Sequence, residues 1–282
     1  MLPKISEIWK NLMQKLETGT NELLCYLNDA VATISLNRPE KLNALGDTLT
    51  PALRETLLRL EDDERVRVIV ITGVGTSFCA GGDVKSMNNQ TPDRSPIEEK
   101  IRNLQNRQKT LALRLYELSK PTIAALPGAA AGAGMSIALA CDLRIGSSNS
   151  FFAPGYARIG LSGDYGISYL LTNIVGPAKA KELMFTGRYV SSDEALSLGL
   201  LNEIVTSDAL TTRTDELAKQ ISDGPPRAIQ YMKENINRSL TENFKICLDY
   251  EADRLVRAAQ TEDHKEGIRA FLEKRSPLFK GK

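Results

Sequence analysis

Two glycine-rich stretches are the part of this sequence best suited to a catalytic role. Residues 72–83, T-G-V-G-T-S-F-C-A-G-G-D, follow the apolar run 66–71, which is typical of a buried strand. Residues 128–134, G-A-A-A-G-A-G, follow a second short apolar run at 122–126. A loop at the end of each strand can direct a bare backbone N–H towards a common point. Two convergent N–H groups would stabilise an oxygen that becomes negative during a reaction.

The segments around these loops alternate between strand and helix periodicity, which predicts an α/β fold with a mostly parallel sheet. Residues 23–27 and 30–36 form a predicted hairpin with its turn at Asn28-Asp29. Residues 1–20 have apolar side chains at helical spacing, which predicts an amphipathic segment outside the core. The remaining predicted strands lie at 66–71, 122–126, 143–145 and 150–153, and the predicted helices at 47–60, 96–118, 134–140, 177–185, 191–199, 208–221, 225–237, 242–259 and 262–272.

The composition of the 282 residues excludes several classes of protein. A net charge of +1 gives no reason to expect a nucleic-acid partner, and no apolar run reaches the roughly 20 residues that cross a bilayer. The first 20 residues lack the apolar core of a secretory leader and contain no arginine. The four cysteines form no C-x-x-C pair, and His264 is the single histidine. We therefore expect reduced thiols, a cytoplasmic location, no metal site and no membrane association.

Four ordered motifs resemble those of the crotonase (enoyl-CoA hydratase/isomerase) superfamily, and together they cover about residues 22–281. They are L-N-R-P-E-K-L-N-A-L at 36–45, S-F-C-A-G-G-D-V at 77–84, the stretch from P-T-I-A-A at 121 to C-D-L at 143, and the closing helix with its F-K ending at 262–280. The resemblance implies a spiral core of ββα units at 22–200, an N-terminal extension at 1–21 and a helical trimerisation region at 201–282. It also implies a homotrimer or a dimer of trimers, and a coenzyme A thioester as substrate with no other cofactor.

The same resemblance implies roles for individual residues. The backbone N–H groups of Gly82 and Ala133 are expected to hold the thioester oxygen, with the positive end of the helix at 134–140 behind Ala133. Lys274 and Lys280 could reach the ligand of a neighbouring subunit. The coenzyme A moiety is expected near Lys41, Leu42, Ala44, Ala80, Asp83, Val84 and Lys85.

The departures from the family pattern concern the proton-transfer groups. Hydratases of this family add water with two glutamates, but Ser136 and Tyr156 stand at the two corresponding positions. We expect these two residues to contact the substrate. The carboxylate that remains in frame is Asp164, at a position where several isomerases of the family carry an aspartate. The surrounding residues look most like the phenylacetate-pathway isomerases, so the resemblance favours an isomerase with Asp164 as its acid and base. The alternative for Asp164 is an N-cap of the helix that begins near Gly166.

Three other functions remain open from the sequence. A hydratase, or a relative of the naphthoate synthases, could use Asp164, Ser136 or Tyr156 with bound water. A non-catalytic subunit that binds acyl-CoA is permitted by the absence of both glutamates. A serine hydrolase, suggested by G-M-S-I-A at 134–138, lacks a partner base near Ser136 because the one histidine lies in the charged run at 261–266.

Overall fold

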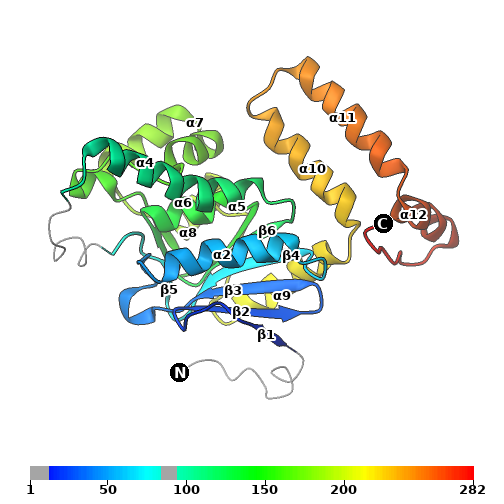
Figure 1. The fold of residues 1–282 in the computed structure, drawn as a ribbon, viewed down its shortest axis with the longest axis horizontal. Coiled ribbons are helices and arrows are strands. Elements are labelled where there is room, and N and C mark those ends of the chain that lie inside the picture. The colour runs from blue at the N-terminus through cyan, green and yellow to red at the C-terminus, as the bar shows by residue number, and fades with distance from the viewer. Residues whose placement is uncertain (1–12, 84–93) are drawn as a thin grey trace.

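The computed structural model describes residues 13–83 and 94–282. Its centre is a seven-stranded sheet in the order β1-β2-β3-β4-β6-β8-β11 (Figure 1). The first three strands are antiparallel, and the neighbours from β3 to β11 are parallel. The bounds of the strands are β1 Gln14–Leu16, β2 Leu23–Asn28, β3 Val31–Leu36, β4 Val68–Gly73, β6 Thr122–Leu126, β8 Leu143–Ser147 and β11 Glu203–Val205.

Strands β4 and β6 in the middle of the parallel part are largely apolar because both faces of the sheet are covered there. Val68 and Val70 of β4 pack into a cluster with Leu210 and Ala218 of helix α9 (Leu210–Ser222). Ile69 and Ile71, which alternate with them, belong to the main core with helix α2 (Leu49–Asp62). In Figure 1 the sheet accordingly lies between α2 and α9. The predicted hairpin, strands and amphipathic helix at 47–60 are confirmed.

A second sheet of four short strands, in the order β10-β9-β7-β5, lies at the carboxyl ends of the central strands. Strand β5 (Ser77–Cys79) follows β4, and β7 (Ala129–Ala131) follows β6, so each of the two glycine-rich stretches contributes one strand. Strands β5, β7 and β9 (Phe151–Ala153) are parallel, and β10 (Val190–Ser191) closes the edge. Repeated strand–strand–helix turns of this kind confirm the predicted spiral of ββα units.

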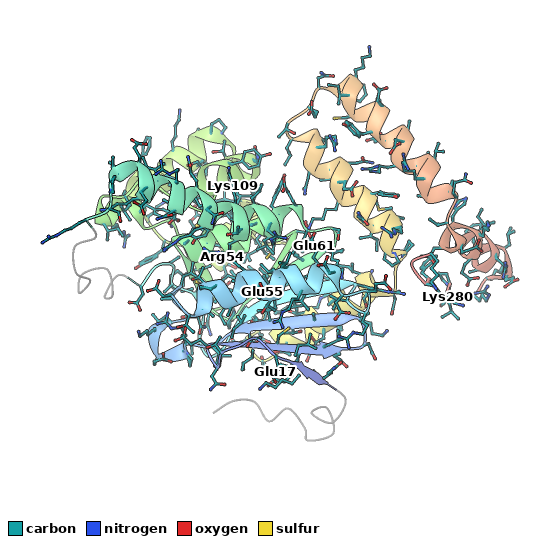
Figure 2. All side chains as sticks on the ribbon, in the orientation of Figure 1. Glu17, Arg54, Glu55, Glu61, Lys109 and Lys280 are labelled. Atoms are coloured by element: carbon teal, nitrogen blue, oxygen red, sulfur yellow. The ribbon has the colours of Figure 1, made fainter. Side chains whose placement is uncertain are left out.

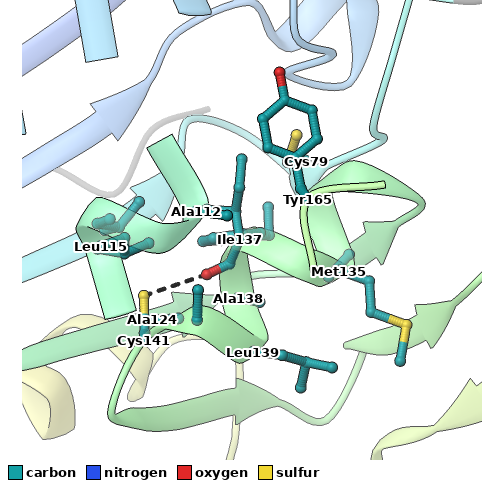
Figure 3. Packing of buried hydrophobic residues seen from close by; sticks show 14 of the residues in the cluster. Cys79, Ala112, Leu115, Ala124, Met135, Ile137, Ala138, Leu139, Cys141 and Tyr165 are labelled. Carbon is teal, nitrogen blue, oxygen red and sulfur yellow. Dashed lines mark hydrogen bonds between the residues drawn. The ribbon is translucent and has the colours of Figure 1, made fainter. Parts of the chain in front are cut away.

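Helix α6 (Ala133–Ala140) is buried along its whole length, which explains its uniformly apolar sequence. The helical stretch Pro96–Leu118 packs over it, and Ala112 and Leu115 join Ile137 and Ala138 in the core (Figure 3). This stretch consists of α4 (Ile97–Gln108), a π-helical segment (Lys109–Leu113) and α5 (Arg114–Glu117). The sequence predicts the helix but not the π turn, because a single turn is too short to give a periodicity of its own.

Three expectations need correction. Residues 14–16 form the edge strand β1, which pairs with β2, although apolar spacing predicts a helix there. Of the other residues of that prediction, 13 and 17–20 form no helix and 1–12 lie outside the described residues. Helix α7 (Ile167–Thr186) begins ten residues before the predicted start at Pro177, and it is interrupted at Gly176. The core also extends past residue 200, because β11 pairs with β8 and α9 packs on the sheet.

The remaining helices form an arm that extends from the core beyond α9 (Figure 1). They are α10 (Pro226–Ser239), α11 (Phe244–Ala259) and α12 (Glu262–Glu273), while the short helix α8 (Ser192–Ser197) stays on the core. Ser191 caps α8, the helix predicted at 191–199, by accepting from the N–H of Glu194, as the N-cap serine of a capping box does. None of the described helices is both long enough and apolar enough to cross a membrane.

A buried ion pair anchors the arm to the core. The Lys233 ammonium on α10 is 2.8 Å from Asp142 Oδ2, and the side chain of Lys233 is only 9% exposed. The same oxygen accepts from the backbone N–H and the hydroxyl of Thr122, at 2.7 and 2.9 Å. Asp142 therefore connects the start of β6, the end of α6 and the arm.

We expect Lys233→Met to lower the free energy of unfolding by about 2 kcal/mol, because it leaves the Asp142 carboxylate without its cationic donor. Lys219→Met is the matched control, since Lys219 pairs with Asp223 on the exposed face of α9; it should change stability by less than about 0.5 kcal/mol. Urea denaturation followed by circular dichroism measures both. Equal losses in the two variants would contradict the anchoring role.

Candidate active site

The first glycine loop is held by the turn before α2, which follows a short 3-10 helix (Pro39–Lys41). The N–H of Ala80 donates to the carbonyl of Leu42 at 3.0 Å, and the N–H of Leu45 donates to the carbonyl of Gly81 at 2.7 Å. These bonds occupy the N–H of Ala80 and the carbonyl of Gly81, which precede Gly82 in the loop. Within the described residues, the N–H of Gly82 donates to no other group. It therefore stays available to an external acceptor.

Asn43 is a structural residue of the site to which the sequence analysis assigns no role. Its fully buried amide accepts from the N–H of Arg38 at 2.8 Å and donates to the carbonyls of Val74 and Ser77 at 3.0 and 2.8 Å. Its φ of 57° lies in the left-handed region, which Asn tolerates better than most residues. An Asn inside the motif at 36–45 is the signal that could have identified it. The amide fixes the turn against both ends of the 74–77 loop.

The second donor is positioned by three successive small residues. Gly132 has a φ of 49° and a ψ of −126°, and its own N–H donates to the carbonyl of Ala153 at 2.9 Å. Ala133 is the first residue of α6, so its N–H has no partner within the helix. Gly134 allows α6 to touch β5, since a Cβ there would lie 2.2 Å from the carbonyl oxygen of Cys79. The positive end of the helix dipole therefore adds to the field at the Ala133 N–H.

The two glycine loops are in contact. Gly81 has a φ of 89°, and a Cβ added to it would lie 2.7 Å from the carbonyl oxygen of Ala131 and 3.2 Å from the nitrogen of Ala133. Only glycine permits so close an approach of the two backbones. The structure thus brings together the two loops that carry the predicted donors Gly82 and Ala133, and their use in catalysis stays a prediction.

The predicted residues Ser136, Tyr156 and Asp164 form a single cluster. The Tyr156 hydroxyl, from the 3-10 turn Tyr156–Ile159, donates to Asp164 Oδ1 at 2.7 Å. The Ser136 hydroxyl on α6 lies 3.4 Å from the Tyr156 oxygen and donates to the backbone carbonyl of Asp164 at 3.1 Å. Ser136 and Tyr156 are buried, while Asp164 is half-buried. The residues at the two glutamate positions therefore hold the one aspartate.

The alternative role of Asp164 as an N-cap is wrong for its side chain. Helix α7 begins at Ile167 after Gly166, and no side chain caps it. The N–H of Ile167 bonds instead to the backbone carbonyl of Asp164 at 3.2 Å. The carboxyl group is turned to Tyr156 and is not consumed by the helix end.

The electrostatics of this cluster favour proton exchange. Burial raises the pKa of Asp164, and the Tyr156 hydroxyl opposes that rise by stabilising the charged form. Burial, and then the negative charge of Asp164, raise the pKa of Tyr156, so the phenol remains a neutral donor. Burial also raises the pKa of Tyr165, whose hydroxyl is 3.4 Å from the guanidinium of Arg54 (labelled in Figure 2). A carboxyl with a raised pKa both accepts and returns a proton more readily near neutral pH.

The predicted coenzyme A residues fall into an exposed and an enclosed group. Lys41 and Leu42 lie at the surface. Asp83 is largely covered and pairs with the Lys41 ammonium at 3.3 Å and with Arg38 Nη2 at 3.4 Å. Ala44 is buried, and its carbonyl accepts from Arg38 Nη1 at 2.6 Å. Arg38 therefore connects Ala44 to Asp83.

The other predicted binding residues are spread more widely. Ala80 is partly exposed at the start of the first glycine loop, and Val84 and Lys85 lie outside the described residues. Lys280 lies beside α12 in the arm (Figure 2), where its N–H donates to Asp263 Oδ1 at 2.6 Å. Lys274 ends α12 with a φ of 53°. The fold therefore places both tail lysines on the arm, away from the cluster around Asp164.

Nucleophilic cysteine or serine chemistry is excluded at this site. Burial raises the pKa of Cys79 and of Cys141 to about 12, so neither thiol ionises near neutral pH. His264 is exposed in the first turn of α12, on the arm. Ser136 bonds to Asp164 and Tyr156, so the serine hydrolase considered from the sequence is wrong.

A cavity of about 650 Å³ lies beyond the cluster, and Ser136, Tyr156 and Asp164 are not among the residues that line it. It lies between α5, the start of α7 and α10, and it meets the site through Tyr165 and Gly166, the two residues after Asp164. Tyr116 and Tyr169 also line it, with their rings in an edge-to-face contact at 6.2 Å. Aromatic and apolar walls of this kind can accommodate an organic group next to the carboxyl.

Comparison with known proteins fits this geometry. The sequence profile of the enoyl-CoA hydratase/isomerase family matches residues 27–282. The chain belongs to that family. The resemblance predicted from the four motifs is thereby confirmed.

Relatives carry both names of the family. The 1,2-epoxyphenylacetyl-CoA isomerase of Escherichia coli is 34% identical over 264 residues, which are 92% of this chain and 98% of the relative. The short-chain-enoyl-CoA hydratase of Clostridium acetobutylicum is also 34% identical, over 90% of this chain and 96% of the relative. Sequence identity alone therefore does not choose between isomerisation and hydration.

Solved structures confirm the crotonase fold. The enoyl-CoA hydratase of Bacillus anthracis superposes with a TM-score of 0.87 at 31% identity, covering 93% of this chain and 100% of that one. An enoyl-CoA hydratase from Polaromonas sp. JS666 gives a TM-score of 0.85 at 33% identity, covering 92% and 99%. The similarity extends over both the spiral core and the helical arm.

The contact between the glycine loops can be tested without substrate. We expect Gly81→Ala to lower the free energy of unfolding by about 3 kcal/mol, from left-handed backbone strain plus the collision with residues 131–133. Gly19→Ala is the matched control, because Gly19 has a similar φ of 76° but open space around it; it should cost about 1 kcal/mol. Denaturant unfolding measures both, and equal costs would contradict the close approach.

Proposed function

We propose that the chain is an acyl-CoA isomerase, which shifts a double bond or rearranges an enoyl-CoA through an enolate of the thioester. The observation that carries the proposal is the cluster around Asp164. The carboxyl of Asp164 is bonded to Tyr156, and Ser136, on the helix that follows the second glycine loop, lies beside that phenol. By the resemblance, these two hydroxyl residues stand where hydratases of the family have glutamates. A double-bond shift needs one group that takes and returns a proton, whereas addition of water calls for two.

The proposed reaction on a 3-enoyl-CoA has two steps. Asp164 takes a proton from C2, the electrons of that C–H bond form a new C1–C2 double bond, and the thioester oxygen becomes negative. The N–H groups of Gly82 and Ala133 stabilise that oxygen, and one such donor is typically worth about 3–4 kcal/mol. Asp164 then returns the proton to C4 while the electrons reform the carbonyl, which leaves a double bond between C2 and C3.

The remaining assignments follow the family. We propose that Lys41, Leu42, Ala44, Ala80 and Asp83, together with Val84 and Lys85, contact the coenzyme A moiety. The acyl group would extend towards the cavity beside Tyr165. The coenzyme A is part of the thioester substrate, and this chemistry requires no separate cofactor.

The arm supports a proposal about assembly. Phe244, Leu255, Phe271 and Leu272 on α11 and α12 are each more than two-thirds exposed, with fractions from 71% to 83%. Single exposed apolar residues are ordinary, but this many on one helical arm favour burial against other subunits. We propose a homotrimer or a dimer of trimers, in the cytoplasm, in which Lys274 and Lys280 approach a neighbouring subunit's ligand.

Hydration is the second candidate, and it is favoured by the hydratase from C. acetobutylicum being as similar as the isomerase from E. coli. A hydratase of this type, or a relative of the naphthoate synthases, would use Asp164 with bound water. A non-catalytic acyl-CoA-binding subunit is the alternative from another class.

The test is a panel of 2-enoyl-, 3-enoyl- and phenylacetyl-derived CoA esters, with hydration and double-bond migration measured separately. We expect migration, and we expect Asp164→Ala to lower its kcat/KM by about 100-fold to 10,000-fold while acyl-CoA binding persists. Asp62→Ala, at an exposed position near the end of α2, is the control and should leave the rate unchanged. Unchanged migration in Asp164→Ala would refute the role of Asp164. Faster hydration than migration would select a hydratase, and tight binding without turnover would select the non-catalytic subunit.

A further inference from the structure

The two hydroxyl residues at the hydratase glutamate positions both contact Asp164: Tyr156 bonds to its carboxyl and Ser136 to its backbone carbonyl. The bond from the Tyr156 hydroxyl to Asp164 Oδ1 is 2.7 Å, the usual length of a well-formed O–H···O hydrogen bond. The Ser136 hydroxyl is 3.4 Å from the same phenol oxygen and 3.1 Å from the carbonyl of Asp164. The arrangement is therefore a chain of contacts from α6 through the 3-10 turn to the loop before α7.

We propose that Tyr156 is the positioning residue for Asp164: its hydroxyl holds Oδ1 and leaves Oδ2 to exchange the proton with the substrate. Ser136 assists by holding the backbone carbonyl of Asp164 and by packing against the phenol. This inference rests on the function proposed above, and it explains why Tyr and Ser stand in place of two acids. Within the described residues, Oδ2 has no hydrogen-bond partner and is not among the fully buried polar atoms.

Holding one oxygen has a geometric consequence. A carboxylate is otherwise free to rotate about its last torsion and to exchange the roles of its two oxygens. The phenol donates its only proton to Oδ1, so a proton taken from the substrate goes to Oδ2 and remains facing the substrate. One oxygen can therefore remove the proton from C2 and deliver it to C4, without a second acid in the site.

The same bond sets the protonation of Asp164. Burial raises the pKa of this carboxyl, and among the residues that the structure describes the Tyr156 hydroxyl is the contact that opposes the rise. The other titratable group beside it is Tyr165, the next residue, whose hydroxyl faces the guanidinium of Arg54 on α2 and whose phenol also feels the charge of Arg107 on α4. The two arginines act on Tyr165 and are not bonded to the Asp164 carboxyl.

These contacts decide the direction in which a substitution of Tyr156 shifts the pKa of Asp164. Tyr156→Phe keeps the buried ring but removes the donor, so the carboxylate form loses stabilisation and the pKa of Asp164 rises further. Hydrogen bonds to charged groups are worth about 1.5–3 kcal/mol, which corresponds to a displacement of about one to two pH units. At pH values below the pKa of Asp164, double-bond migration by Tyr156→Phe should be slower than in the wild type by about 10-fold to 100-fold, because less of the base is ionised.

Two measurements test the proposal. The first is the pH dependence of kcat/KM for double-bond migration, in which Tyr156→Phe should move the rising limb to higher pH by about one to two pH units. The second is an infrared titration of the carboxyl C=O stretch in protein containing ¹³C-labelled aspartate, assigned by its loss in Asp164→Asn. It should show the same displacement in Tyr156→Phe, and a smaller one in the same direction in Ser136→Ala.

Tyr165→Phe is the matched control, because it removes the hydroxyl of a buried tyrosine that adjoins Asp164 but bonds to Arg54. Tyr165→Phe should not change the pH at which the Asp164 carboxyl titrates. An Asp164 titration that is the same in the wild type and in Tyr156→Phe, or one displaced equally by Tyr165→Phe, would overturn the proposal.

The infrared titration needs no turnover, so the two proposals can fail separately. A displaced carboxyl titration in a chain that moves no double bond would retain the positioning role and refute the isomerase. Should Tyr156→Phe fold poorly, Ser136→Ala gives the answer, because it alters the support of the phenol and leaves the ring in place.

Discussion

The contact between the backbones of two glycine loops is the constraint on which the rest of the site depends. Gly81 lies against Ala131 and Ala133 so closely that a methyl group would collide with both. The elements around it serve this approach: Asn43 fixes the turn before α2, Gly134 allows α6 to touch β5, and the parallel sheet aligns the ends of β4 and β6. An oxyanion site of this kind is made of main-chain groups, so its geometry is decided by packing and not by the chemistry of side chains.

At Asp164, burial and a hydrogen bond have opposite effects on the carboxylate. Partial burial makes its charge unfavourable, and a single phenol hydroxyl restores part of that stability. The two buried side chains next to Asp164, Ser136 and Tyr156, are neutral hydroxyl groups and not acids. The remaining carboxyl then has no close acidic neighbour competing for its proton among the described residues. One acid held by neutral groups suits a reaction that returns the proton it takes.

Much of this fold and site could be predicted from the sequence because the signals are local. Apolar runs that end in glycine fix β4, β6 and the two loops, and the order of four motifs indicates the family. The contacts that could not be predicted join residues distant in the chain or depend on exact geometry. The Asp142–Lys233 pair spans 91 residues, Asn43 acts through a left-handed backbone, and β1 pairs as an edge strand despite helical spacing. The bond between Tyr156 and Asp164 could not be predicted either, because it depends on how the 3-10 turn Tyr156–Ile159 and the loop before α7 lie in space.

The central claim is that one thioester oxygen is held by the N–H groups of Gly82 and Ala133 while Oδ2 of Asp164 faces C2. The most direct measurement is a crystal structure with bound acetoacetyl-CoA, which enolises as the proposed intermediate does. The account predicts the thioester oxygen within about 3 Å of both nitrogens and C2 within about 3.5 Å of Oδ2. A thioester oxygen that meets only one of these N–H groups, or a carboxyl turned away from C2, would contradict it.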